Sequence, residues 1–399
     1  MPAADRMTPL ELRASIGLAS IFGLRMLGMF VIMPVFAIYA ERLRGGDNLT
    51  LVGLAIGAYG LTQALLQIPF GWLSDRWGRK PVIYFGLLVF AGGSFIAAAA
   101  DSIGGVIAGR ILQGAGAISA VVIALTADLT RDSQRTKAMA MIGSMIGLTF
   151  ALSLVASPWL NALIGVPGIF TLTGALSLAA IAVVHWIVPA TVAAKPRPAA
   201  RSAGLLKLLC DPQLARLNFG IFALHAVLMA LFIVVPLSLR DHGLGVDQHW
   251  QVYLPVMIGS FALMLPPVLL AERQGQLREV FAGAVAVLLA GHLAMPWLLG
   301  GTVAIAVFLL IFFSAFNVLE AMLPSLTSKL APAEAKGAAM GIYSSVQFFG
   351  TFAGAASGGY LFQHFGARGI LAFDAALLLV WLILAFGMTA PRRPAALEM

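Results

Sequence analysis

Charge is scarce in this sequence. Only 11% of its 399 residues are Asp, Glu, Lys or Arg, whereas 60% are hydrophobic. A soluble domain is about a quarter charged and about half apolar, so this composition excludes an ordinary soluble protein. Apolar runs of roughly 20 residues, the length that crosses a bilayer, recur along the whole chain. We therefore expect a polytopic membrane protein whose first partner is the lipid bilayer.

Cysteine and the common catalytic motifs are almost absent as well. The single cysteine, Cys210, excludes an intramolecular disulfide and a cysteine-based zinc or iron–sulfur site. The sequence has no G-x-x-x-x-G-K-[ST], H-E-x-x-H or G-x-S-x-G pattern. We expect no cofactor, no metal and no enzyme activity, and we expect a proton gradient rather than a nucleotide to supply energy.

The formal net charge of +8 comes from basic residues that lie between the apolar runs, so we expect no nucleic-acid partner. Nineteen of the 25 Lys and Arg fall on one side of the predicted membrane, four on the other, and two within spans. Cytoplasmic loops of membrane proteins are the ones enriched in Lys and Arg. This asymmetry predicts that both termini are cytoplasmic, most simply in a bacterial inner membrane.

The hydrophobic pattern predicts twelve spans. They cover residues 15–40, 50–73, 81–99, 103–127, 137–163, 168–188, 214–240, 250–271, 279–299, 301–328, 336–363 and 367–388. Runs this long and continuous favour helices over barrel strands, which makes the fold all-α. The first run is too long for a signal-peptide core, so we expect it to remain as a span.

The chain divides into two similar halves. We predict an N-terminal six-helix bundle at 1–189, a cytoplasmic linker rich in Pro, Ala and basic residues at 190–213, and a C-terminal six-helix bundle at 214–399. The segment LSDRWG at 73–78 is echoed by LAERQG at 270–275, and TKAMAM at 136–141 by AKGAAM at 335–340. Two echoes at nearly one offset indicate a duplicated unit.

One cytoplasmic loop, GWLSDRWGRK at 71–80, concentrates charge between two apolar runs. Topology alone would need only its basic residues and does not explain Asp75 or the spacing of the two glycines. The pattern G-x-L-x-D-R-x-G-R-K resembles the signature loop of the major facilitator superfamily. That resemblance implies twelve helices in two pseudo-symmetric bundles around a central cavity, with spans one, four, seven and ten lining it.

The resemblance also implies a cytoplasmic latch. Asp75 is expected near the start of span eleven, at 336–337, where a helix dipole favours a carboxylate, and Arg79 is expected to pair with Asp128. These contacts are expected to close the cytoplasmic side of the outward-facing state. The predicted latch comprises Gly71, Asp75, Arg76, Gly78, Arg79, Lys80 and Asp128. The second-half copy has lost its last two basic residues, so we expect an asymmetric latch.

Two arginines are predicted within spans. Arg110 opens RILQGAGA, which resembles the R-x-x-Q-G-x-G-A motif of proton-coupled family members. An arginine inside hydrocarbon is costly and faces a cavity or a partner, so Arg110 either contributes to coupling or bonds structurally to backbone carbonyls. Arg25 in span one is expected to face the cavity, where it either attracts an anionic substrate or neutralises an acid such as Glu320.

Glu320 is expected to be the most deeply placed acid. Asn317 lies three residues earlier on the same helix face, and Pro324 removes the N–H that would bond the carbonyl of residue 320. Because desolvation favours a protonated carboxyl, Glu320 is either a proton-carrying site or a structural acid. His225 and Asn218 are further candidates for the cavity.

Two features limit these expectations. Asp374 in the last span is expected near the outer end, as an interfacial residue. Antiporters of the superfamily carry Gly-Pro and two further glycines late in span five, whereas this chain has SPWL at 157–160. That departure leaves a drug:proton antiporter less well supported.

Within the superfamily, the chain resembles the YajR-type transporters at RMLGMF (25–30), GLTQ (60–63) and FNVLE (316–320). Some members carry a soluble C-terminal domain, whose function we do not expect here because the chain ends soon after the last span. We expect a monomeric secondary active transporter, a proton-coupled antiporter exporting small molecules. The alternatives are a proton symporter or uniporter of the same fold, a non-transporting sensor, and a polytopic membrane enzyme.

Overall fold

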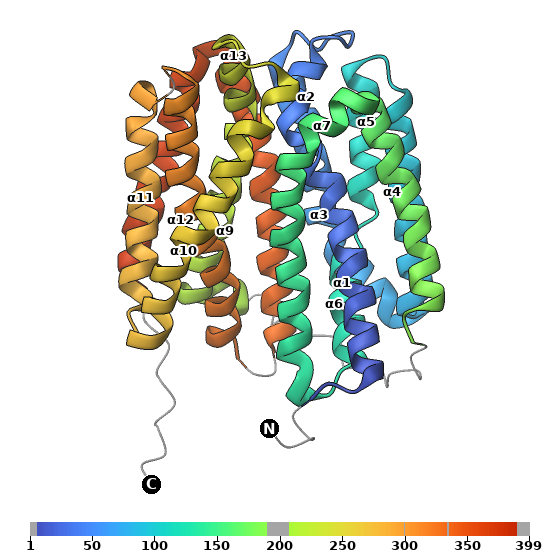
Figure 1. Cartoon of the computed structure of the whole chain (residues 1–399). Helices are drawn as coiled ribbons and strands as arrows, with labels where there is room; N and C mark the ends of the chain where they lie inside the picture. Colours follow the sequence, from blue (N-terminus) through green and yellow to red (C-terminus); the bar gives the residue numbers. More distant parts are fainter. Residues whose placement is uncertain (1–5, 190–206, 299, 333–334, 389–399) are drawn as a thin grey trace.

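A computed structural model describes residues 6–189, 207–298, 300–332 and 335–388, which form an almost entirely helical molecule (Figure 1). Most of the predicted linker, at 190–206, lies outside the described residues. The helices are α1 (Pro9–Phe30), α2 (Met33–Ala40), α3 (Leu49–Trp77), α4 (Arg79–Ala99), α5 (Ile103–Ala115), α6 (Ser119–Asp128), α7 (Asp132–Trp186), α9 (Pro212–Asp241), η2 (Val246–Gln248), α10 (Trp250–Gln274), α11 (Leu277–Leu298), α12 (Thr302–Leu330) and α13 (Lys336–Phe386).

Ten helical segments of the described chain are long and apolar enough to cross a membrane. Two of them, in α7 and α13, run for 54 and 51 residues. At roughly 1.5 Å per residue, each is more than twice as long as the ~30 Å hydrocarbon core requires. Each contains one non-helical glycine, Gly165 in α7 and Gly366 in α13, where the chain turns back. Counting each leg as a crossing gives twelve, the number that the hydropathy pattern predicts.

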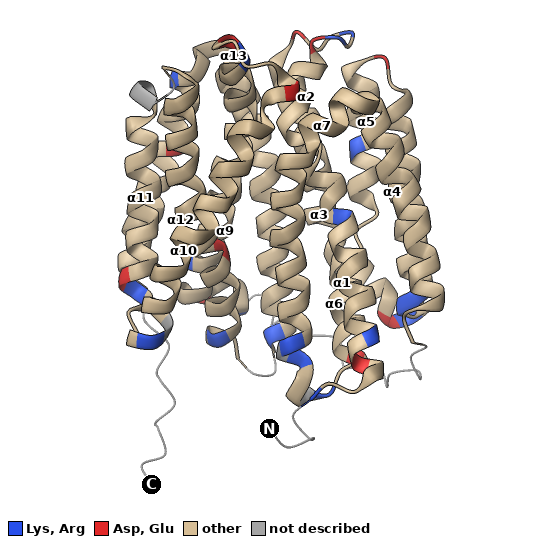
Figure 2. Cartoon of the chain, viewed as in Figure 1, with Lys and Arg blue, Asp and Glu red and all other residues tan. Residues whose placement is uncertain are grey.

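The first described helix begins and the last one ends at the same end of the molecule, here called the terminal end (Figure 1). Lys and Arg residues gather at this end, and the opposite or far end carries fewer of them (Figure 2). This asymmetry predicts that the terminal end faces the cytoplasm.

Positive backbone φ angles mark the same turns in both halves of the chain. Among the described residues, six glycines have positive φ. They form three pairs, Gly45 with Gly243, Gly78 with Gly275, and Gly165 with Gly366, separated by 198, 197 and 201 residues. Glycine reaches this region without the steric cost of a Cβ atom. The repeated spacing supports a duplicated six-helix unit.

The two halves pack tightly where α3 meets the first leg of α13. A Cβ atom added to Gly53 would lie 2.2 Å from the carbonyl oxygen of Ala355, and one added to Gly57 would lie 2.9 Å from that of Phe352. Only glycine allows backbones to approach this closely, as in small-residue contacts between membrane helices. We call this glycine-lined contact the seam.

Polar contacts hold the far end of the seam. The backbone N–H of Leu49 donates to Gln363 Oε1 at 2.7 Å. Arg240, near the end of α9, donates to both carboxylate oxygens of Glu41 at 2.7 Å. Phe150 of α7 also lies 5.7 Å, centroid to centroid, from Phe313 of α12. The halves are therefore joined at the far end and at mid-depth.

Toward the terminal end, the small residues on these helices no longer meet the other half. A Cβ atom added to Gly71 of α3 would touch only Ala120, which belongs to the same half. Cβ atoms added to Gly337 or Gly341 of α13 would meet nothing within 4 Å. The described structure is therefore closed at the far end, and α3 and α13 diverge toward the terminal end.

Candidate functional site

Glu320 lies in α12, where three side chains from neighbouring helices surround its carboxylate. His225 Nε2 of α9 is 4.0 Å from Glu320 Oε2, and Gln347 Nε2 of α13 donates to Glu320 Oε1 at 3.5 Å. Tyr343 of α13 is within electrostatic range of the same carboxylate. Glu320 Oε2 has no hydrogen-bond partner, and 30% of the side chain is exposed. The Glu320 side chain is therefore partly exposed, as is that of Gln347, whereas the Oε2 atom itself is buried.

The hydrogen bonds of His225 indicate its tautomer. Nδ1 lies 3.2 Å from the carbonyl oxygen of Ile221, which can only accept, so Nδ1 carries the proton. Nε2 then accepts from the Gln347 side chain at 2.9 Å. The assigned network therefore describes a neutral imidazole facing an acid, with the Gln347 amide donating to both.

The other two polar candidates of this half lie apart from the carboxylate. Asn317 donates to Ser260 Oγ of α10 at 3.1 Å. Asn317 and Glu320 of α12 therefore contact different neighbouring helices. Asn218 lies about two turns before His225 on α9, and its Oδ1 atom is buried without a partner. Pro324 lies inside α12 as predicted, one turn after Glu320.

Arg25 does not reach Glu320. It is 1% exposed and donates to Gln63 Oε1 at 2.7 Å and to the hydroxyls of Ser119 and Tyr59 at 3.1 Å. Two roles were considered from the sequence, and in this conformation Arg25 does not neutralise Glu320. Its guanidinium is buried among neutral groups of the N-terminal half.

Arg110 makes the contacts of the structural alternative. It donates to the carbonyl oxygens of Gly28, Ala55 and Ile56 at 3.2–3.4 Å and to Gln113 Oε1 at 3.0 Å. Its guanidinium also lies 5.0 Å from the centre of the Tyr59 ring. Carbonyl oxygens can satisfy an arginine in a dry interior, so this geometry ties α5 to α1 and α3.

The charged loop between α3 and α4 brings three predicted latch residues together. Arg79 Nε lies 3.1 Å from Asp128 Oδ2 at the end of α6, and Arg79 Nη1 lies 2.6 Å from Asp75 Oδ1. Lys80 donates to the carbonyl oxygen of Val188 at 2.6 Å. Gly78 ends α3 with a φ of 92°, and the guanidinium carbon of Arg76 lies 3.7 Å from the centre of the Trp72 ring.

The predicted contact between Asp75 and the start of α13 is not made in this conformation. Asp75 is 56% exposed, and within the described residues its ion pair is with Arg79. Lys336 and Gly337 are exposed. An unengaged latch agrees with the divergence of α3 and α13 at this end.

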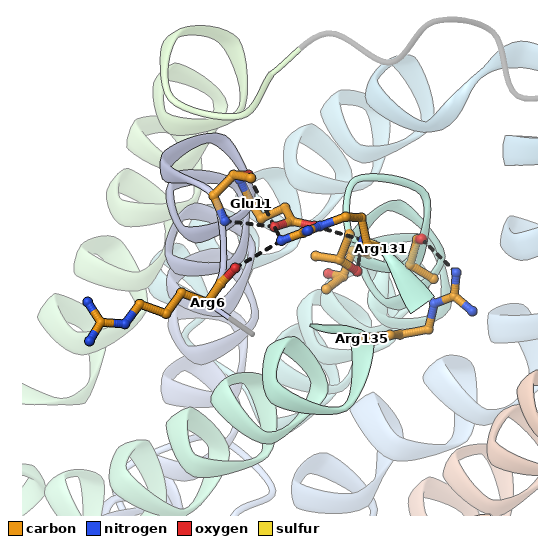
Figure 3. A network of polar contacts seen from close by, with 8 residues as sticks. Arg6, Glu11, Arg131 and Arg135 are labelled. Atoms are coloured by element: carbon orange, nitrogen blue, oxygen red, sulfur yellow. Dashed lines mark hydrogen bonds and ion pairs between the residues drawn. The ribbon is translucent and has the colours of Figure 1, made fainter. Parts of the chain in front are cut away.

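A second ion pair at the terminal end was missed from sequence. Arg131, at the start of α7, donates to both oxygens of Glu11 in α1, with Nε–Oε1 at 2.9 Å and Nη2–Oε2 at 3.0 Å (Figure 3). Thr8 and Glu11 form a capping box that holds the carboxylate. The pattern Thr-x-x-Glu before an apolar run is the signal that could have identified it. Arg131 is three residues after Asp128, so the Arg79–Asp128 and Glu11–Arg131 ion pairs both anchor the segment between α6 and α7.

Comparisons with known proteins agree with this architecture. The family model described as Major Facilitator Superfamily matches residues 18–355 and 256–398. The chain is 44% identical over 97% of its length to "Inner membrane transport protein YajR" of Escherichia coli K12, covering 85% of that protein. It is 26% identical to "Multidrug resistance protein MdtH" of Aeromonas salmonicida, with 86% of each chain covered.

Among solved structures, a bacterial homolog of the human lysosomal transporter Spinster matches with a TM-score of 0.75. The match covers 98% of this chain and 100% of that one at 14% identity, so it supports the assignment of the fold alone. Within the described residues, no group of three or more His, Cys, Asp or Glu side chains could hold a metal ion.

Proposed function

Because this chain belongs to the Major Facilitator Superfamily and is a membrane transporter, we propose that it exports small molecules by proton-coupled antiport. The observation that carries the proposal is Glu320, a partly exposed acid with a neutral histidine and an amide beside it, inside an apolar helix. An intramembrane acid with such partners is the usual place for proton binding in transporters. No cofactor is needed, because the proton gradient supplies the energy.

The two ends of the seam support an alternating-access mechanism. The far end is closed by Glu41–Arg240 and by the contact of Gly53 with the backbone of α13. We infer that this conformation opens toward the terminal end, which we place in the cytoplasm of a bacterial cell. When the terminal end closes, Asp75 would contact Lys336 and Gly337 and so engage the latch.

The export direction rests on one relative. The protein named for multidrug resistance in Aeromonas salmonicida shares 26% identity, and the aromatic row of α12 next to Glu320 could receive an apolar substrate. The Ser157–Pro158 departure from the antiporter pattern keeps proton symport and uniport as the alternatives with the same fold. A monomer is sufficient, since one chain supplies both halves.

The experiment is transport in proteoliposomes with an imposed pH gradient, using a panel of apolar, cationic and anionic compounds. Glu320→Gln removes the ionisable group and keeps its shape and polarity. Glu279→Gln, at the exposed first turn of α11, is the matched control. Loss of gradient-driven transport in Glu320→Gln alone supports the proposal, whereas full gradient-driven transport in Glu320→Gln overturns it.

A further inference from the structure

A second acid–histidine pair lies outside the site just described. Asp374, on the second leg of α13, and His292, on α11, are both 0% exposed, and Asp374 Oδ2 is 3.6 Å from His292 Nε2. The expectation that Asp374 is interfacial is therefore wrong. Asp374 lies eight residues past the turn at Gly366, about 12 Å along the helix axis, where α11 packs against this leg of α13.

The carboxylate of Asp374 has no hydrogen bond. Both of its oxygens, and His292 Nε2, lack a hydrogen-bond partner among the described residues. His292 Nδ1 lies 2.8 Å from the carbonyl oxygen of Leu288, so Nδ1 carries a proton and Nε2 presents a lone pair toward the acid. An ionised carboxylate without hydrogen bonds in a dry interior is among the costliest groups in a protein.

Other charged groups on the surrounding helices do not compensate this acid. On α11, Arg278 and Glu279 lie roughly 20 Å along the axis from His292. On α13, Arg368 is exposed and about 9 Å along the axis from Asp374. On α12 and α9, the nearest titratable groups are Glu320 and His225, which pair with each other. His292 is therefore the group that can share a proton with Asp374.

We propose that Asp374 and His292 form a second proton-binding site, sealed inside the C-terminal half and holding one proton between them in this conformation. The proton resides on the carboxyl oxygen that faces the Nε2 lone pair, so the pair is neutral overall. It keeps α11 against the second leg of α13, since removing the proton would leave an uncompensated charge between two packed helices.

An aromatic row connects the sealed pair to the accessible one. The His292 ring lies 5.8 Å from the Phe312 ring, Phe312 stacks on Phe316 at 5.8 Å, and Phe316 lies 6.0 Å from the His225 ring. His225 in turn faces Glu320. The rings therefore form a continuous packed row from His292 to His225, which lies beside Glu320.

Infrared spectroscopy of the purified full-length protein tests the site, because a protonated carboxyl has a carbonyl stretch that an ionised one lacks. We expect such a band at neutral pH that disappears in Asp374→Asn, shifts in His292→Gln and persists in Glu320→Gln. Asp101→Asn is the control, because Arg44 lowers the pKa of the exposed Asp101 carboxyl and keeps it ionised.

An unchanged band intensity in folded Asp374→Asn would show that Asp374 is ionised and would overturn the proposal. If Asp374→Asn fails to fold, Asp374→Glu keeps a carboxyl at this position and must shift the same band, and an unshifted band again overturns the site. Neither result depends on transport. Failure of the antiport proposal and failure of this site are thus distinguished.

Discussion

The imidazole of His225 and the carboxylate of Glu320 come from different helices, 95 positions apart in sequence, and their nearest atoms lie 4.0 Å apart. Gln347 contacts both. The neutral imidazole accepts a hydrogen bond from the amide and leaves Glu320 Oε2 free to take a proton.

Replacing His225 by Leu should therefore change how Glu320 binds its proton. Leucine cannot accept the hydrogen bond that the Gln347 amide donates to His225. The amide should then donate only to the Glu320 carboxylate, which stabilises its ionised form. We expect the pH dependence of transport to shift toward acid in His225→Leu, with the rate at the optimum reduced about tenfold or less. The pH profile of uptake into vesicles measures this, and an unchanged profile would mean that His225 is only structural.

The pair Arg79–Asp128 should stabilise the N-terminal half in every conformation. Both side chains are mostly buried, with 15% and 10% exposed, and both belong to that half. We expect Asp128→Asn to lower the free energy of unfolding by about 1.5–3 kcal/mol, the value of a hydrogen bond to a charged group. Thermal unfolding in detergent measures the loss.

Asp75 should behave in the opposite way. It is 56% exposed in this conformation, so Asp75→Asn should leave the melting temperature nearly unchanged. The proposed contact with the start of α13 exists only when the terminal end closes, and the substitution should therefore slow the transport cycle. A large fall in melting temperature with normal transport would contradict the latch.

The seam depends on Gly53. Its Cβ atom in Gly53→Ala would lie 2.2 Å from the Ala355 carbonyl oxygen, so α3 and α13 must separate. We expect a cost of about 1–3 kcal/mol to the far-closed conformation, as for overpacked cores. Gly143→Ala is the control, because its Cβ atom meets nothing within 4 Å. Distances between spin labels on the far ends of the two halves should lengthen only in Gly53→Ala.

Glu41 and Arg240 offer a charge-swap test of the far end. The pair is partly exposed, with 47% of the Glu41 side chain and 36% of the Arg240 side chain accessible, so it contributes about 0–1 kcal/mol. Glu41→Lys alone should raise the far-open population by up to about fivefold. Combining it with Arg240→Glu should restore the original population, and the same spin-label distances report it. A double variant that remains as open as the single one would exclude this pair as a gate.

Hydropathy predicted most of the fold, because each membrane crossing must satisfy its own backbone and so has a recognisable length and composition. The turns at Gly165 and Gly366 fall between predicted spans for the same reason. Arg79 and Asp128 could be paired beforehand because a known loop motif relates them.

The site itself was harder to predict. Gln347 and Tyr343 lie on the first leg of α13, outside any motif, and only helix packing brings them to Glu320. Asp374 and His292 are 82 positions apart, and neither lies in a motif. Arg25 contacts Gln63 and Ser119 because of how α1, α3 and α6 are rotated about their axes. A hydropathy pattern does not specify these rotations.

Proton coupling through Glu320 is most directly tested by the lumenal pH of proteoliposomes during substrate movement without an imposed pH gradient. The account predicts that substrate moving in one direction drives protons in the other with the native chain and with Glu279→Gln. In Glu320→Gln, substrate exchange should continue while the pH change disappears. A substrate-driven pH change of normal size in Glu320→Gln would contradict the account.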